Sequence, residues 1–260
     1  MIYKGVYEAS LIAKRMSLCK QALLAVSLLT LSTICLAQVG VQKKIIRLAK
    51  PQSEPTPITN QATGQRMTIN EYNELAKADP FAYHLVPNYD EFGQPTTYTM
   101  RSATPEEHET HRFRDRDPAK QPKAGQSIAP FVMTDVEGNT YRSADLLGNV
   151  VVLSFWVSLD KSVWDDKQAA AFAEALRPFQ SKTAPVVLGV LNSEQAKAES
   201  GVIGKSLPFK PIPNAYGFHN KYHITTIPTI VVIGKDGKVV ANLQGASSIE
   251  KLKQVLATVL

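Results

Sequence analysis

Residues 150–164 read Val-Val-Val-Leu-Ser-Phe-Trp-Val-Ser-Leu-Asp-Lys-Ser-Val-Trp. The apolar, β-branched run over 150–155 is typical of a strand that is buried on both faces of a sheet. Beyond it, apolar residues recur at helical spacing as far as Pro178, which predicts a helix from about Lys161 to Arg177. A buried strand that leads into such a helix indicates an α/β domain.

The same alternation of strands and helices continues over residues 124–260. Two turn signals, Glu137-Gly138-Asn139 and Asp236-Gly237, each predict a hairpin. Ser247 is expected to open the last helix as part of a capping box. The predicted strands are 128–134, the region around 141, 150–155, 186–191, 229–233 and 238–243, and the predicted helices are 161–177, 193–199 and one that begins at 247.

Residues 38–123 are rich in proline and polar residues. Nine prolines interrupt this segment too often for long helices or central strands. Two short helices fit between them, one capped by Thr68 that runs through Ala76 and one that begins at Thr104-Pro105. We therefore predict a Pro-rich, partly irregular extension and linker over 38–123, followed by one α/β domain over 124–260.

The first 37 residues have the layout of a secretory signal peptide. Basic residues up to Lys20 precede an uncharged apolar run, and small residues stand at positions −3 and −1 of a cut after Ala37. The run is short for a membrane span, so an uncleaved N-terminal anchor is the alternative. Initiation at Met16 instead of Met1 gives a signal of more usual length. We expect an exported protein, periplasmic or otherwise extracytoplasmic.

Both cysteines of the chain, Cys19 and Cys35, fall within this predicted signal. The mature chain is therefore expected to contain no thiol and no disulfide. Residues 1–37 also carry three of the six net positive charges, which leaves a net charge of +3 on the mature chain. This small net charge, without a cluster of basic residues, does not indicate a nucleic-acid partner.

Several short motifs follow one another in a characteristic order. They are Ala129-Pro130-Phe131, Asp135-x-x-Gly138, Leu153-Ser154-Phe155-Trp156, Tyr222-x5-Pro228-Thr229 and Gly234-x-Asp236-Gly237-Lys238. Their order and spacing resemble the thioredoxin-like proteins of the TlpA/ResA (redoxin) type over about half of the chain, residues 124–260. The resemblance implies a thioredoxin-like α/β fold, with a central mixed sheet and helices on both faces, behind the Pro-rich segment. It also implies an exported thiol–disulfide oxidoreductase that reduces partner cysteines.

The resemblance fails at the two residues that carry the chemistry. The family has Cys-x-x-Cys after this strand, and here Asp160 and Val163 hold the two cysteine positions. Thiol–disulfide exchange needs an attacking thiolate and a second sulfur, and neither side chain supplies one. Asp160 is expected to act as the N-cap of the following helix, and Val163 to pack beneath the turn. No catalytic residue is predicted.

The face around the missing dithiol retains five candidate binding residues: Trp156, Asp160, Lys161, Ile227 and Pro228. The Ile227-Pro228 pair matches the family's cis-proline loop, and the resemblance implies that this loop pairs with an extended substrate peptide in relatives. A turn that merely enters a strand is the alternative interpretation. For Trp156, the alternative to partner contact is packing in the core.

The sequence gives weaker evidence for a metal or cofactor site than for the peptide-binding loop. His219 and His223 are four residues apart, a spacing that suits two metal ligands on one helical face. Two structural histidines are the alternative, since no third ligand is identified. His108 and His111 lack the zincin spacing. The sequence contains neither a phosphate-cradling glycine loop nor a Gly-x-Ser-x-Gly elbow, and we predict no cofactor.

The sequence leaves three hypotheses for function. The favoured one is a non-catalytic module that binds a protein or peptide in the cell envelope, touching the membrane only through a possible uncleaved anchor. The first alternative is an oxidoreductase-family protein that acts in envelope redox homeostasis through a partner. The second alternative is metal binding through His219 and His223.

Overall fold

The structure is a computed structural model, and it describes residues 57–160, 162–180, 184–202 and 206–260. The predicted signal peptide and Lys161 lie outside these ranges. Among the helices of the described ranges, none has the length and apolar character needed to cross a bilayer.

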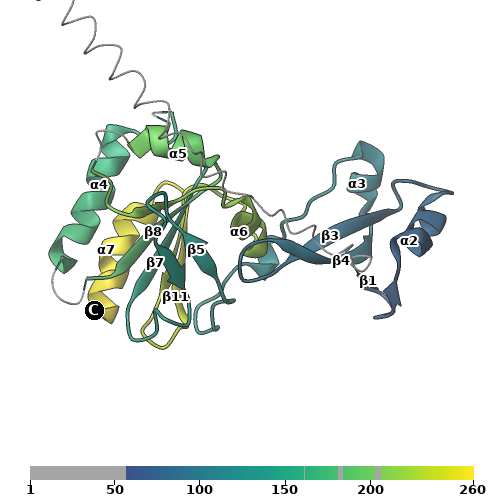
Figure 1. The fold of residues 1–260 in the computed structure, drawn as a ribbon, viewed down its shortest axis with the longest axis horizontal. Helices are drawn as coiled ribbons and strands as arrows, with labels where there is room; N and C mark the ends of the chain where they lie inside the picture. The colour runs from purple at the N-terminus through teal and green to yellow at the C-terminus, as the bar shows by residue number, and fades with distance from the viewer. Residues whose placement is uncertain (1–56, 161, 181–183, 203–205) are drawn as a thin grey trace, which may run out of the picture. The chain divides into compact units, whose positions relative to one another are not determined.

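Five strands form the central sheet. They are β7 (Val151–Trp156), β8 (Val186–Leu191), β9 (Lys210–Ile212), β10 (Thr229–Ile233) and β11 (Val239–Gln244). Their order is β11-β10-β7-β8-β9, and Figure 1 labels β11, β7 and β8 of this sheet. Strands β7, β8 and β9 are parallel, whereas β10 runs antiparallel to both β7 and β11. The mixed sheet predicted from the sequence is confirmed, and β8 has the predicted bounds.

Side chains of the central strands alternate between two cores, one on each face of the sheet. In β7, Val152 and Trp156 belong to one core, while Leu153 and Phe155 belong to the other. All six residues of β7 are buried. Because successive strand residues point to opposite faces, a strand that is buried on both faces needs a continuous apolar run.

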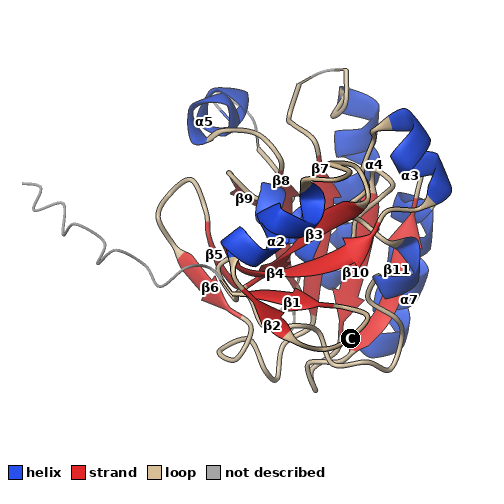
Figure 2. Cartoon of the chain, turned by 90° about the vertical axis from the view of Figure 1, so that its right-hand side faces the viewer, coloured by secondary structure: helices blue, strands red, loops and turns tan. Residues whose placement is uncertain are grey.

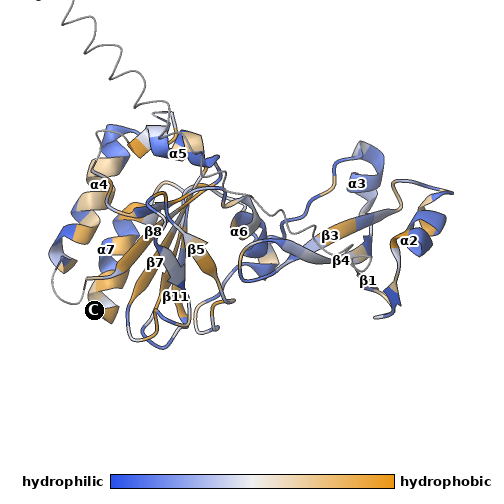
Figure 3. Cartoon of the chain, viewed as in Figure 1, coloured by the Kyte–Doolittle hydropathy of each residue, from blue (hydrophilic) through white to orange (hydrophobic). Residues whose placement is uncertain are grey.

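Different elements cover the two faces. Helices α4 (Asp166–Leu176), α5 (Gln195–Val202) and α7 (Ser248–Val259) contribute to the core that contains Trp156. Helix α6 (Tyr216–Lys221) and the hairpin of β5 (Val132–Thr134) and β6 (Thr140–Arg142) contribute to the core that contains Phe155. Apolar residues accordingly concentrate on the central strands, as Figure 3 shows in orange.

Two predicted helix starts are corrected by the structure. Helix α4 begins at Asp166 instead of about Lys161, because Asp160 accepts the N–H groups of Val163 and Trp164 in a separate turn ahead of the helix. Ser247 precedes α7, but its backbone is already helical (φ −81°, ψ 0°) and its hydroxyl makes no capping bond. An N-cap side chain reaches the helix amides from an extended backbone, so the capping box predicted at Ser247 is wrong.

Residues 57–110 form a second, four-stranded sheet with two helices (Figure 2). Its order is β2 (Arg66–Met67), β1 (Ile58–Asn60), β4 (Pro95–Ser102) and β3 (Tyr83–Tyr89). The sequence predicts no strands here, yet the prolines fit, because Pro87 lies in an edge strand and Pro95 is the first residue of its strand. Helices α2 (Ile69–Ala76) and α3 (Pro105–Thr110) are confirmed, each with a complete capping box.

The turn of the β3–β4 hairpin packs directly on α6. A Cβ atom added at Gly217 would lie 1.7 Å from the carbonyl oxygen of Gly93. The Asn220 amide donates to the Tyr89 hydroxyl at 2.8 Å, and the Lys221 ammonium donates to the Asp90 carbonyl oxygen at 2.7 Å. These contacts join the smaller sheet to the larger one through α6.

Candidate functional site

The two positions at which the resemblance places a dithiol lie in the turn 157–165, between β7 and α4. Strand β10 pairs with β7 in a register that places Thr229 opposite Phe155. Extending this register by two residues brings the Ile227-Pro228 pair to the end of the sheet at which the turn begins. Apart from Lys161, the candidate binding residues therefore come from two neighbouring segments at one end of the sheet.

The turn is closed by the carbonyl oxygen of Asp160. This oxygen accepts the backbone N–H of Val163 at 2.9 Å and that of Trp164 at 2.8 Å. The Asp160 carboxylate accepts a hydrogen bond from the Ser158 hydroxyl at 2.9 Å, and the residue is exposed. Asp160 thus stabilises its own turn and still faces solvent.

The N-cap of α4 is Asp165. Its backbone is extended (φ −83°, ψ 169°), and its carboxylate accepts the N–H of Gln168 at 2.7 Å. The side-chain oxygen of Gln168 accepts the N–H of Asp165 at 3.2 Å, which completes a capping box. The capping role predicted for Asp160 is therefore wrong, because the chain makes an additional turn before the helix begins.

Trp156 has an exposed fraction of 0%. Its indole N–H donates to the Ser154 hydroxyl at 2.6 Å, which satisfies the polar group of the ring. The ring packs edge-on against Trp164, with 4.5 Å between the centroids, and both tryptophans pack edge-on against Phe172. The alternation of β7 places Trp156 in the core, so its prediction as a binding residue is corrected and the core-packing alternative holds.

Two apolar side chains anchor the turn from beneath. Leu159 and Trp164 are both 3% exposed. Leu159 packs against Gly201 of α5, where an added Cβ atom would lie 3.0 Å from the leucine Cβ. Val163 is half-buried and packs against the same core, whereas Val157 is 45% exposed. The turn at the positions expected for a dithiol is thus packed, with a small apolar and acidic outer surface.

The peptide bond between Ile227 and Pro228 is cis, the conformation that the resemblance implies. Both residues are half-buried. The Pro228 carbonyl oxygen accepts the N–H of Gly245 at 2.9 Å, and the Thr226 carbonyl oxygen accepts the hydroxyl of Thr229 at 2.6 Å. The loop is therefore fixed on both sides of the proline.

Residues 223–225, ahead of the proline, are held by Arg116 and Gln121, for which the sequence predicted no functional role. The Arg116 guanidinium donates to the Ile224 carbonyl oxygen at 2.7 Å. The Gln121 amide donates at 2.9 Å to both the His223 carbonyl oxygen and the Thr225 hydroxyl. The partners are more than 100 residues apart in the sequence, so no local pattern marks these contacts.

His219 and His223 have separate structural roles. His219 is buried, its Nε2 donates to the Val190 carbonyl oxygen at 3.1 Å, and burial lowers its pKa to about 4. His223 lies beyond the end of α6 in a left-handed conformation (φ 51°), and its Nδ1 accepts the N–H of Asp117 at 3.1 Å. Within the described ranges, no group of three or more His, Cys, Asp or Glu residues could hold a metal ion. This geometry gives the metal-binding hypothesis no support.

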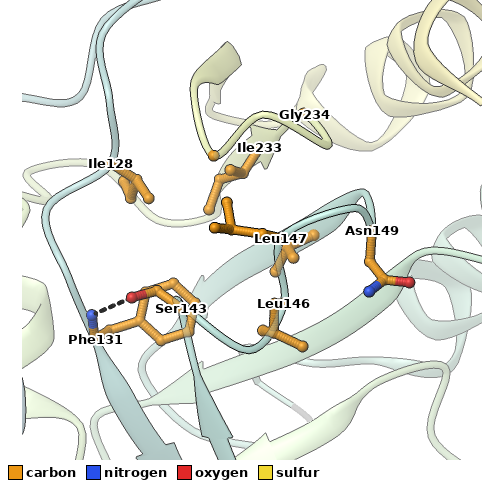
Figure 4. A pocket seen from close by; sticks show the side chains of 10 residues that line it. Ile128, Phe131, Ser143, Leu146, Leu147, Asn149, Ile233 and Gly234 are labelled. Carbon is orange, nitrogen blue, oxygen red and sulfur yellow. Dashed lines mark hydrogen bonds between the residues drawn. The ribbon is translucent and has the colours of Figure 1, made fainter.

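A small pocket lies at the opposite end of β7, near Val151 (Figure 4). Its walls are mostly apolar and include Ile128, Phe131 and Leu147. Ser143 accepts the N–H of Phe131 at 3.1 Å. None of its lining residues is titratable, so the pocket supplies no general acid or base.

A family model for the thioredoxin-like domain matches residues 137–260. This part of the chain is a thioredoxin-like domain. The thiol–disulfide oxidoreductase ResA of a Bacillus cereus strain is 27% identical over 133 residues, which cover 51% of this chain and 76% of the relative. ResA of Geobacillus thermodenitrificans is 28% identical over 141 residues, covering 52% and 77%. The resemblance to the TlpA/ResA type is confirmed.

Two solved structures are each similar to about half of the chain. The exposed lipoprotein thioredoxin of Streptococcus pneumoniae matches with a TM-score of 0.41 and 25% identity, covering 50% of this chain and 99% of the other. A thiol:disulfide interchange protein from Chlorobium tepidum matches with a TM-score of 0.46 and 18% identity, covering 54% and 99%.

Proposed function

We propose that this protein is an exported binding module that engages an extended segment of a partner protein in the cell envelope without thiol chemistry. The observation that carries the proposal is the turn 157–165. Asp160 and Val163 replace the dithiol there, and the buried side chains of Leu159 and Trp164 hold the turn against the core. Such a turn lies where the resemblance places a dithiol, but it carries no thiol.

The distribution of cysteine supports this proposal. Attack on a disulfide requires a thiolate, and resolution of the mixed disulfide requires a second sulfur. The chain has two cysteines, Cys19 and Cys35, and none between residues 36 and 260. Cleavage of the expected signal peptide removes both, so the exported protein has no sulfur with which to perform exchange.

The surface available to a partner combines the turn with the prolyl loop. Val157 is an exposed apolar residue, Asp160 is exposed beside it, and Thr225 and Thr226 are exposed ahead of Pro228. An extended peptide can form main-chain hydrogen bonds along such a loop, while side-chain contacts supply specificity. This arrangement favours a peptide ligand.

Matched substitutions at the two ends of β7 test the docking surface. Val157 and Leu147 are both exposed apolar residues, at 45% and 58%, and Leu147 borders the pocket at the far end of the strand. We expect Val157→Asp to reduce crosslinked partner recovered from the envelope about tenfold, the effect of losing one well-packed interface contact. Leu147→Asp should leave recovery unchanged. Equal recovery with both variants would contradict the proposal.

The names of the relatives favour a second candidate, an oxidoreductase-family protein that acts in redox homeostasis through a partner. The double substitution Asp160→Cys/Val163→Cys tests whether the surrounding surface accepts a disulfide substrate, because one turn already joins the two positions through a 2.9 Å hydrogen bond. Insulin reduction by this variant would favour the second candidate. A variant that forms its disulfide but reduces no insulin would favour the binding module.

A further inference from the structure

The loop that leads into Pro228 is held from outside the thioredoxin-like domain. We call residues 116–121 the strap. Three consecutive residues of the loop, His223, Ile224 and Thr225, each accept a hydrogen bond from a strap side chain. The strap belongs to the segment that precedes the domain, so that segment acts directly on the candidate docking loop.

Gln121 makes the largest share of these contacts. It is 6% exposed, and its amide nitrogen uses both hydrogens, on the His223 carbonyl oxygen and the Thr225 hydroxyl. Its amide oxygen accepts a hydrogen bond from the Gln244 side chain at 2.5 Å. Both ends of the Gln121 side chain are therefore used, one on the loop and one on β11.

The contact with β11 reaches the other side of the proline. Gln244 is paired with Thr229, the residue after Pro228, in the β10–β11 ladder. Gly245, the next residue, donates its N–H to the Pro228 carbonyl oxygen. Gln121 thus connects the residues before the prolyl bond to the strand that borders the residues after it.

We propose that Gln121 is a positioning residue of the docking loop, and that the strap makes the N-terminal segment part of the partner-binding site. This inference rests on the proposed function, since it concerns the same loop. A loop that is already ordered loses less conformational entropy when a peptide binds, so fixing residues 223–227 in advance strengthens binding. Removal of the Gln121 donor leaves two loop acceptors without that partner.

The substitution Gln121→Glu isolates this role. It keeps the length of the side chain and the oxygen that accepts from Gln244, but it lacks the nitrogen that donates to His223 and Thr225. The matched control is Gln254→Glu, which makes the same chemical change at an exposed position of α7, outside this network. Thr225→Val removes only one of the two loop bonds from an exposed residue, so it serves if Gln121→Glu does not fold.

Two measurements on the full chain test the proposal. Hydrogen exchange followed by mass spectrometry reports on the order of residues 223–227, and fluorescence anisotropy reports the affinity for S-carboxymethylated insulin B chain, a thiol-free peptide probe. We expect Gln121→Glu to accelerate exchange of the loop about tenfold and to weaken probe binding about tenfold, as the loss of one to two hydrogen bonds implies. Gln254→Glu should change neither.

The outcomes separate this inference from the proposed function. Unchanged exchange in Gln121→Glu, or faster exchange with unchanged probe affinity, would overturn the role of Gln121. Failure of the unsubstituted chain to bind the probe would contradict the proposed function itself. In that case the exchange data still decide whether Gln121 orders the loop.

Discussion

His219, a candidate metal ligand by its spacing, is a buried residue of the core. Its ring is 1% exposed and lies edge-on to Phe155, with 5.2 Å between the centroids. Burial disfavours the charged imidazolium, and the nearby Arg116 charge acts in the same direction. The histidine is therefore neutral at neutral pH, and its protonation opposes folding.

The pH dependence of stability follows from this pKa. The folded-state pKa of about 4 lies below the unfolded value of about 6.5, so this contribution is complete above pH 6.5 and is lost as the pH falls toward 4. We expect the free energy of unfolding, measured with urea, to fall by about 2 kcal/mol between pH 7.5 and 5 on account of His219. His219→Gln keeps a donor for the Val190 carbonyl oxygen and should lose less stability over this range. An identical pH dependence in both proteins would refute the assignment.

The turn 157–165 determines which aspartate caps helix α4. Two aspartates, Asp160 and Asp165, precede the helix, and either could cap it by residue type. The structure selects Asp165, because Leu159 and Trp164 both turn into the core and close a separate turn between the two aspartates.

Alanine substitutions distinguish the two aspartates. Asp165→Ala removes the carboxylate that caps α4 and should cost about 1 kcal/mol of unfolding free energy. Asp160→Ala removes only an exposed bond with Ser158 and should cost under about 0.5 kcal/mol. Urea unfolding of both variants checks the order, and a larger loss at Asp160 would restore it as the structural cap.

The elements that the sequence predicted correctly are those determined by a few neighbouring residues. The capping boxes at Thr68 and Thr104 each lie within four residues, and the apolar run of β7 encodes burial on both faces. The capping box expected at Ser247 had the right residues, but the backbone there is already helical. The strands β1 to β4 are short or proline-bearing, and their sheet forms through pairing that no single segment reveals.

At the scale of the whole molecule, α6 links the smaller sheet to the thioredoxin-like domain. A Cβ atom added at Gly217 of this helix would collide with the carbonyl oxygen of Gly93. The strap adds bonds from Arg116 and Gln121 to the loop that follows α6. The cis bond expected at Ile227-Pro228 is confirmed, but the sequence could not reveal these contacts, since they depend on the tertiary fold.

The substitution Gly217→Ala tests whether the hairpin packs on α6, because packing and helix propensity change the stability in opposite directions. Helix propensity alone favours alanine over glycine by about 0.5–1 kcal/mol in a helix. A Cβ atom at this position, however, meets the Gly93 backbone at 1.7 Å, which forces the hairpin away from α6. We expect net destabilisation, seen as a lower midpoint in urea unfolding. A stabilised variant would show that the hairpin does not pack on α6.

The most direct test of the central claim, partner binding without thiol chemistry, uses the full chain with Cys19→Ser and Cys35→Ser. This chain contains no sulfhydryl at all, since Cys19 and Cys35 are its two cysteines. The measurement is the recovery of crosslinked partner from the envelope, compared with the unsubstituted chain. We expect the same partner in the same yield from both chains. Loss of the partner from the cysteine-free chain would contradict this claim.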